Sequence, residues 1–185
     1  MPSKGFEGGH LMITKTLFDR IIAQYAQNIN GRHGLAHWAR VLENGRRLAL
    51  MNGARIQVVE LFAVFHDSCR VTEKGDPGHG QRGADLAASL RGKVFDLSDG
   101  DFDLLYDACV RHTDGETQAD ITVQTCWDSD RLDLGRVNIM PSPDKLCTAA
   151  AKEKTTLEWA IRRSVENVEP LLIRDEWGVA NYFKN

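Results

Sequence analysis

A long apolar run near the middle of the chain ends in an adjacent histidine and aspartate. It covers residues 55–70, RIQVVELFAVFHDSCR, and its polar end contains His66 and Asp67. Burying an imidazole and a carboxylate after so hydrophobic a segment is costly unless something compensates the lost hydration, and a bound cation is a common compensation. The pair is therefore the first candidate for a functional site.

Length and composition favour one compact domain. The chain has 185 residues, of which 42% are hydrophobic and 26% charged, close to ordinary globular usage. We expect the domain to cover residues 13–173, between a loose N-terminal arm (residues 1–12) and a C-terminal tail (residues 174–185). The formal net charge of −3 lacks the basic excess of a dedicated nucleic-acid binder, so we expect a small ligand and no stable nucleic-acid partner.

Four widely spaced cysteines indicate reduced thiols and a cytoplasmic location, because no Cys-x-x-Cys pair or dense disulfide framework is present. They are Cys69, Cys109, Cys126 and Cys147. No window approaches the roughly 20 apolar residues of a membrane span, and no signal-peptide pattern opens the chain. We expect no membrane association, and the sequence leaves open whether the protein is a monomer or a homodimer.

Hydrophobic periodicity predicts six or seven helices without a convincing strand pair, which indicates an all-α, single-domain helical bundle. The third predicted helix is apolar on more than one side, as is typical of a central, buried helix. A glycine-rich loop is expected to run up to His79, Ser98 to cap a helix, and Val165 to face inward on the last helix. The predicted helices are residues 14–28, 33–51, 54–68, 81–90, a segment that follows Ser98, 121–132 and 148–167.

Six side chains suited to divalent metals lie beside the expected helix ends and loops. Neutral imidazole and carboxylate donors together favour Mn, Fe, Ni, Co, Mg or Zn over a soft-metal site. The six residues are His37, His66, Asp67, His79, His112 and Asp130.

Three of the motifs carry a resemblance to a known family. HWARV contains His37, FHDSCR contains the dyad, and WDSDRLD contains Asp130. In this order, over about residues 33–134, the chain resembles the HD-domain superfamily of metal-dependent phosphohydrolases and its H…HD…D pattern. The resemblance implies that His37, the dyad His66 and Asp67, and Asp130 are metal ligands in an HD-type helical bundle.

Some members of that family hold a second metal ion with two further histidines between the dyad and the last aspartate. His79 in GHGQRGADLA and His112 in RHTDG resemble those positions. The resemblance thus implies one or two divalent ions, with Asp67 as the carboxylate that bridges them when two are bound.

The function that the resemblance implies is phosphoester hydrolysis, by a phosphatase or phosphodiesterase acting on a small phosphorylated metabolite or a nucleotide. A metal lowers the pKa of bound water and polarises the phosphoryl oxygen, and Asp67 or Asp130 is expected to orient the attacking water. Arginine side chains pair well with phosphate oxygens. Of five arginines beside the motifs, we favour Arg70 and Arg82, because they lie in the predicted loop regions; the others are Arg40, Arg111 and Arg131.

Two other functions stay open. One oxygen-using relative has a similar six-ligand arrangement on the same fold, so a di-iron oxygenase is an alternative. A nucleotide-sensing module that binds phosphate without turnover is the other.

Some residues near the motifs have competing interpretations. Asp128 competes with Asp130 within WDSD, and we expect Asp128 to be a solvated or helix-capping acid. An alternative places His112 with two cysteines, Cys109 and Cys126, in a zinc site, but core packing explains these thiols better. His33 lies four residues before a predicted ligand and is expected on the surface, in the first turn of a helix.

Overall fold

The chain folds into helices joined by short connections. A computed structural model describes residues 12–170 and 175–179, and the only β-structure within these ranges is an isolated bridge between Arg91 and Phe95. The expected all-α fold class is confirmed. No helix in the described ranges has the length and the apolar character needed to cross a bilayer. The helices are α1 (Lys15–Ile22), α2 (Leu35–Asn52), α3 (Ile56–Phe65), α4 (His79–Leu90), α5 (Asp99–Arg111), α6 (Ile121–Arg131), the 3-10 helices η1 (Leu134–Val137) and η2 (Pro143–Lys145), α7 (Ala149–Lys152) and α8 (Lys154–Val165).

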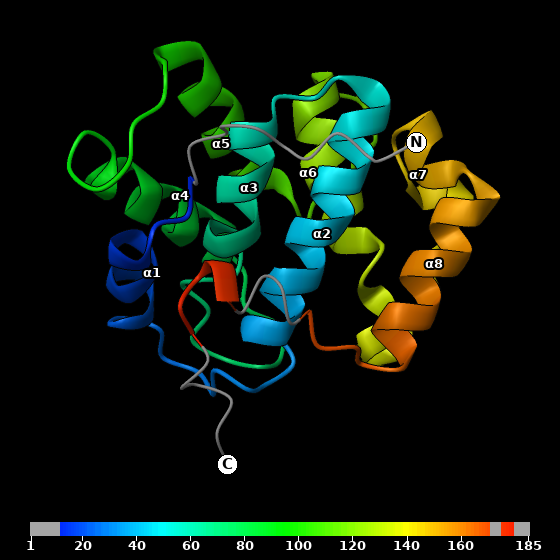
Figure 1. Cartoon of the computed structure of the whole chain (residues 1–185), viewed down its shortest axis with the longest axis horizontal. Coiled ribbons are helices and arrows are strands. Elements are labelled where there is room, and N and C mark those ends of the chain that lie inside the picture. The colour runs from blue at the N-terminus through cyan, green and yellow to red at the C-terminus, as the bar shows by residue number, and fades with distance from the viewer. Residues whose placement is uncertain (1–11, 171–174, 180–185) are drawn as a thin grey trace, which may run out of the picture.

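Helix α3 lies in the middle of the fold, with α4 and α5 on one side and α2 on the other (Figure 1). Val58, Val59 and all of residues 61–65 are completely buried. Each large apolar side chain buried in this way contributes roughly 1.5–3 kcal/mol to stability. The expected central, buried helix is therefore present, and its C-terminal end lies deep inside the protein.

A close approach of α2 to α3 depends on Gly45. A Cβ atom at this position would lie 2.4 Å from Val59 Cγ1. A glycine in a helix interior ordinarily costs some stability, but here it lets the two helices that carry His37 and His66 pack closely.

Helix α4 begins earlier than expected, so the prediction of a loop position for His79 is wrong. Gly78 caps the helix in the left-handed conformation, with φ of 85°, and His79 is the first helical residue. The Asp76 carboxylate accepts a hydrogen bond from Val71 N at 2.7 Å and folds the preceding loop back on itself. The His79 imidazole is therefore carried by the first turn of α4.

The last predicted helix is two helices. Glu153 has an extended backbone and separates α7 from α8. The buried stripe of α8 is Thr156, Ala160 and Ser164, whereas Val165 is 55% exposed, so its predicted inward orientation is wrong. Small residues are needed here because η1 approaches closely: a Cβ at Gly135 would lie 2.1 Å from Ser164 Oγ.

The first helix is shorter than predicted, and it packs against the C-terminal part of the chain. Helix α1 ends at Ile22, although Tyr25 in the following loop still packs against the core. Trp177 stacks on Phe18 with ring centroids 5.3 Å apart. Met12 is also buried, while residues 1–11, 171–174 and 180–185 lie outside the described part, so the boundaries of the arm and the tail stay predictions.

Candidate metal centre

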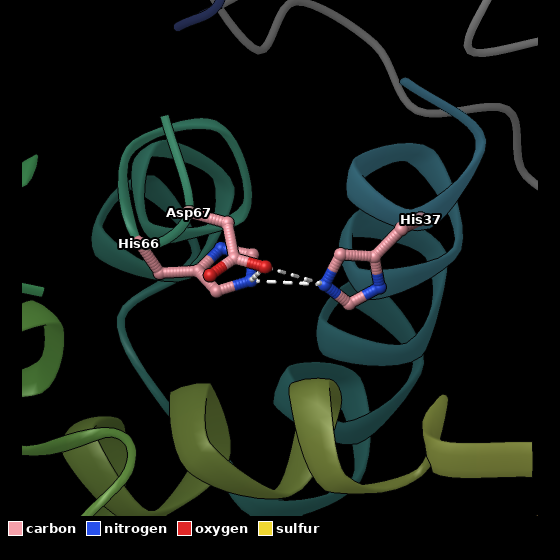
Figure 2. Close-up of side chains that lie close together, drawn as sticks. All are labelled: His37, His66 and Asp67. Carbon is pink, nitrogen blue, oxygen red and sulfur yellow. Dashed lines mark hydrogen bonds and ion pairs between the residues drawn. The ribbon is translucent and has the colours of Figure 1, made fainter. Parts of the chain in front are cut away.

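The six candidate ligands meet at one end of the bundle. His37 lies near the start of α2, His79 at the start of α4, and the others at or just after the C-terminal ends of α3, α5 and α6. Figure 2 shows the His37 ring pointing toward His66 and Asp67. Residues distant in the sequence are thus brought within a few ångströms by the packing of five helices.

The first group of ligands surrounds His37 Nε2. This atom lies 3.1 Å from His66 Nε2, 3.4 Å from Asp67 Oδ2 and 3.4 Å from Asp130 Oδ1. His66 Nε2 in turn lies 3.8 Å from Asp130 Oδ1. The donor atoms of His37, His66 and Asp67 are close enough to share one metal ion, and Asp130 adds a fourth oxygen beside them.

The second group uses the other oxygen of Asp67. Asp67 Oδ1 lies 3.0 Å from His79 Nε2 and 3.8 Å from His112 Nε2, and the two histidine atoms are 2.9 Å apart. These three residues also satisfy the spacing of a metal site. Asp67 therefore presents one oxygen to each group, which is the arrangement that a bridging carboxylate needs.

All four histidines use Nδ1 to donate a hydrogen bond to a protein acceptor. A neutral ring that donates from Nδ1 presents a lone pair at Nε2. The Nε2 lone pairs therefore face each other in two pairs, His37 with His66 and His79 with His112. Facing lone pairs repel each other, but a cation between them makes the arrangement favourable, and the donor set fits a divalent metal. The acceptors are the carbonyl oxygens of Phe62 (3.1 Å), Asp76 (2.6 Å) and Cys109 (2.7 Å) for His66, His79 and His112, and the Asp133 carboxylate (2.7 Å) for His37.

The electrostatics of the first group favour the protonation states that metals bind. Burial alone would raise the pKa of Asp67, but the surrounding imidazoles, His66 foremost, hold it well below its usual value. Burial opposes ionisation of Asp130 too, and the same ring and His37 lower its pKa. Burial lowers the pKa of His66 to about 3, which keeps the ring neutral. Charged carboxylates and neutral imidazoles are the forms that coordinate a cation.

Comparison with known proteins adds a structural match. No family model matches the sequence, and no curated protein matches it. The crystal structure of a predicted HD superfamily hydrolase from an uncultured Thermotogales bacterium is similar, with a TM-score of 0.62, 22% sequence identity, and 89% of this chain and 92% of that chain covered. The chain has the HD-domain fold.

Within this fold, the cluster of candidate ligands is most exposed to solvent at Asp130. The Asp130 side chain is 16% exposed, whereas the other five ligands are at most 5% exposed. Asp130 is therefore the candidate ligand that solvent reaches most readily.

The two arginines predicted to bind phosphate occupy different positions. Arg70 Nη1 donates to His79 Nε2 at 3.0 Å and to Asp67 Oδ1 at 3.3 Å, directly beside the cluster. Arg82 contacts none of the six ligands in the described ranges; it pairs with Asp76 at 2.7 Å. Both arginines line a surface pocket of about 460 Å³ that also contains Cys69.

The other three arginines named from the sequence are held in separate contacts. Arg111 forms an ion pair with Asp107 at 2.9 Å. Arg131 Nη2 donates to the Glu116 carbonyl at 2.7 Å. Arg40 is buried against Asp133.

Asp128 has a role in the fold and lies apart from the cluster contacts. Its carboxylate accepts hydrogen bonds from Cys147 N at 2.7 Å and from Thr148 N and Oγ1 at 2.8 Å each. It thus anchors the start of α7, while Asp130, two residues later, points to the histidines.

Neither possible metal group in the described ranges contains Cys109 or Cys126, and burial raises the pKa of both thiols.

Two features near the cluster differ from the sequence-based expectations. His33 lies in the loop before α2 with a side chain only 12% exposed, and its Nδ1 pairs with Glu73 at 2.9 Å, so the expected surface position in a helix is wrong. Asp133 was not singled out, although it lies three residues after Asp130 and the WDSDRLD motif contains it. That spacing is the one sequence signal that Asp130 and Asp133 share a side of the chain.

Proposed function

We propose that this HD domain is a metal-dependent hydrolase that cleaves a phosphoester of a small phosphorylated metabolite or nucleotide. The observation that carries the proposal is that the Nε2 atoms of four histidines and the oxygens of two carboxylates, Asp67 and Asp130, gather in one buried cluster. The structural neighbour is described as a predicted HD superfamily hydrolase, which supports hydrolysis at the coarse level.

The residues divide into two sets of metal ligands. His37, His66, Asp67 and Asp130 would hold a first ion, and Asp67, His79 and His112 a second. Nitrogen and oxygen donors of this kind suit Mn, Fe, Ni, Co, Mg or Zn. When bound, a divalent ion supplies Lewis-acid stabilisation of phosphoryl charge and lowers the pKa of water.

The protein groups position the reactants for displacement at phosphorus. Asp130 is the most exposed of the candidate ligands, and its carboxylate accepts a hydrogen bond from the attacking water and orients it, with Asp67 beside it. The water oxygen forms a bond to phosphorus and gives a proton to the Asp130 carboxylate, while the bond to the leaving oxygen breaks with its electron pair and that oxygen takes a proton from solvent. Arg70 is placed to pair with phosphoryl oxygens next to the cluster; Arg82 would bind a more distant part of the substrate.

A phosphate-release assay on the full chain tests this function. The metal-free protein is reconstituted separately with Mn²⁺, Co²⁺, Ni²⁺ or Mg²⁺ and given a panel of sugar phosphates, nucleotides and p-nitrophenyl phosphate. We expect release that a chelator abolishes and metal restores, and that Asp67→Asn lacks. Asp103→Asn, at an exposed position of α5, is the matched control and should behave as wild type.

Two outcomes contradict the proposal. Absence of release from every phosphoester by metal-loaded protein overturns hydrolysis and favours a module that only binds its ligand. Oxygen consumption by the iron-loaded protein, without phosphate release, favours the oxygenase.

A further inference from the structure

The carboxylate behind His37 is itself held by a buried arginine. Asp133 Oδ2 accepts a hydrogen bond from His37 Nδ1 at 2.7 Å, while Arg40 Nε and Nη2 donate to Asp133 Oδ1 and Oδ2 at 2.6 and 3.1 Å. All three side chains are at most 3% exposed. A two-pronged pair between an arginine and a carboxylate fixes the plane of the carboxylate. The orientation of the His37 ring therefore depends on Arg40 as well as on Asp133.

The same arginine also reaches the end of α8. Arg40 Nη1 donates to Asn167 Oδ1 at 2.9 Å and to the Val168 carbonyl at 3.2 Å. Asn167 has φ of 49°, in the left-handed region where helices commonly terminate. Because the chain turns at Asn167, both acceptors face Arg40. Three parts of the fold, namely α2, the segment after α6 and the end of α8, meet at this guanidinium.

This arrangement is specific to one of the four histidines. Asp133 is a carboxylate paired at both oxygens with the buried Arg40 guanidinium. A carboxylate is a stronger acceptor than a carbonyl and increases the basicity of the opposite ring nitrogen toward a metal. The Nδ1 atoms of the other three histidines reach only backbone carbonyls.

We propose that Asp133, Arg40 and Asn167 form a positioning relay for His37, through which the end of α8 sets the affinity of the first metal ion. The relay rests on the metal binding within the proposed function and does not require phosphoester hydrolysis. Its members touch neither substrate nor metal and act through His37.

Metal titration of the full, metal-free chain tests the relay. Co²⁺ binding is followed by visible absorption, and Mn²⁺ binding by calorimetry. We expect Asp133→Asn to weaken the first ion by about 10–100-fold, the usual loss for a group behind a metal-bound histidine, and to leave the second ion unchanged. A changed Co²⁺ spectrum would report altered geometry at His37, which a general loss of stability does not produce.

A milder variant keeps the test valid if Asp133→Asn fails to fold around the uncompensated Arg40. Asn167→Gly removes one acceptor of Arg40, and glycine tolerates the positive φ. We expect it to weaken the first ion by about 2–10-fold, below the loss expected at Asp133 itself. The control is Asn138→Gly, because Asn138 is likewise exposed with a positive φ (62°), but it follows η1 and, among the described residues, accepts no hydrogen bond from Arg40.

The outcomes separate the relay from the proposed function. Equal affinities for Asn167→Gly and Asn138→Gly overturn the link to α8, and a wild-type affinity in folded Asp133→Asn overturns the relay as a whole. A wild type that binds metal but releases no phosphate overturns only the hydrolase. A wild type that binds no divalent ion overturns both.

The His37 Nδ1 proton gives a readout that needs no metal. In the metal-free protein its NMR resonance should lie far downfield because of the Asp133 carboxylate, and Asn167→Gly should shift it while Asn138→Gly does not. An unshifted resonance in Asn167→Gly contradicts the relay.

Discussion

The two halves of the ligand cluster share Asp67 but differ in their surroundings. In the first half, His37 Nδ1 donates a hydrogen bond to the Asp133 carboxylate, and Asp130 adds a second negative group. In the second half, the Nδ1 atoms of His79 and His112 donate to backbone carbonyls, and the Arg70 guanidinium contacts His79 Nε2. The first half is thus arranged to attract a cation, whereas in the second half a cation must compete with a positive charge already present.

The pKa shifts follow the same division. Burial lowers the pKa of His66 to about 3 in the first half. Burial would lower the pKa of His112 too, but the nearby Asp67 carboxylate raises it. A ring that holds its proton more firmly binds metal less readily. We therefore expect the two ions to bind in order, the first more tightly than the second.

The largest effect is expected from the residue that both halves share. Asp67→Asn removes a negative charge from each group and should lower kcat/KM by about 10³-fold or more, since a catalytic metal contributes several kcal/mol to transition-state stabilisation. Metal analysis of the purified variant should show the loss of both ions. Retention of one tightly bound ion would show that the halves are more independent than their geometry indicates.

Gly80 offers a way to disturb the second half alone. A Cβ there would lie 2.2 Å from the Cys109 carbonyl and 3.0 Å from His112 Nδ1, so Gly80→Ala should reduce the free energy of unfolding by about 1–3 kcal/mol through overpacking and weaken the second ion. Urea unfolding and metal titration measure the two effects. Gly100→Ala on α5, with open space around it, is the control. An unchanged second-ion affinity in Gly80→Ala would separate helix packing from ligand position.

Arg70 allows the competition in the second half to be tested directly. Arg70→Gln should strengthen the second ion by about tenfold, which corresponds to about 1.4 kcal/mol and lies within the range for charges about 4 Å apart. The same variant should raise KM, because the group proposed to bind phosphate is lost. Calorimetric titration and steady-state kinetics measure these opposite changes, and weaker binding of the second ion would contradict the assigned competition.

The smallest effect concerns the loop on the side of the first half. Tyr25 Oη donates to the His33 carbonyl at 3.0 Å, and removing this bond in Tyr25→Phe should cost about 0.5–1.5 kcal/mol at pH 7. Burial, followed by the charges of Asp67 and Glu73, raises the pKa of Tyr25. The unfolded chain therefore loses the phenol proton first, and the wild type should lose this stabilisation above about pH 10.

Urea unfolding of wild type and Tyr25→Phe between pH 7 and pH 11 isolates this contribution, because the other titrating groups are common to both proteins. The difference in unfolding free energy should shrink above about pH 10. A constant difference would mean that the Tyr25 pKa is the same in the folded and unfolded states.

The sequence predicted the candidate site well where one motif contained both a candidate residue and the helix that carries it. The apolar run of α3 indicated a buried helix, and its polar end lies in the cluster. Asp130 and Asp128 were distinguished by the frame of WDSDRLD, and the structure places one beside the histidines and the other at the start of α7. That these residues bind metal stays a prediction.

Features that depend on contacts between distant segments, or on the capping of a helix, could not be predicted from the sequence pattern. The role of Asp133 arises only because α2 brings His37 and Arg40 to it from about a hundred positions earlier. The break at Glu153 has no glycine or proline beside it, so hydrophobic periodicity predicts α7 and α8 as one helix. The glycines around His79 predict a loop, whereas Gly78 caps α4 and makes His79 its first residue.

The candidate ligands come from the ends of five helices, α2 to α6. A cation held there would act as a cross-link between segments from α2 to α6, and its binding energy would add to the cohesion of the fold. At a concentration 100 times the Kd, one such ion adds about 2.7 kcal/mol to the free energy of unfolding. The lifetime of the protein in a cell would then rise and fall with the supply of its metal.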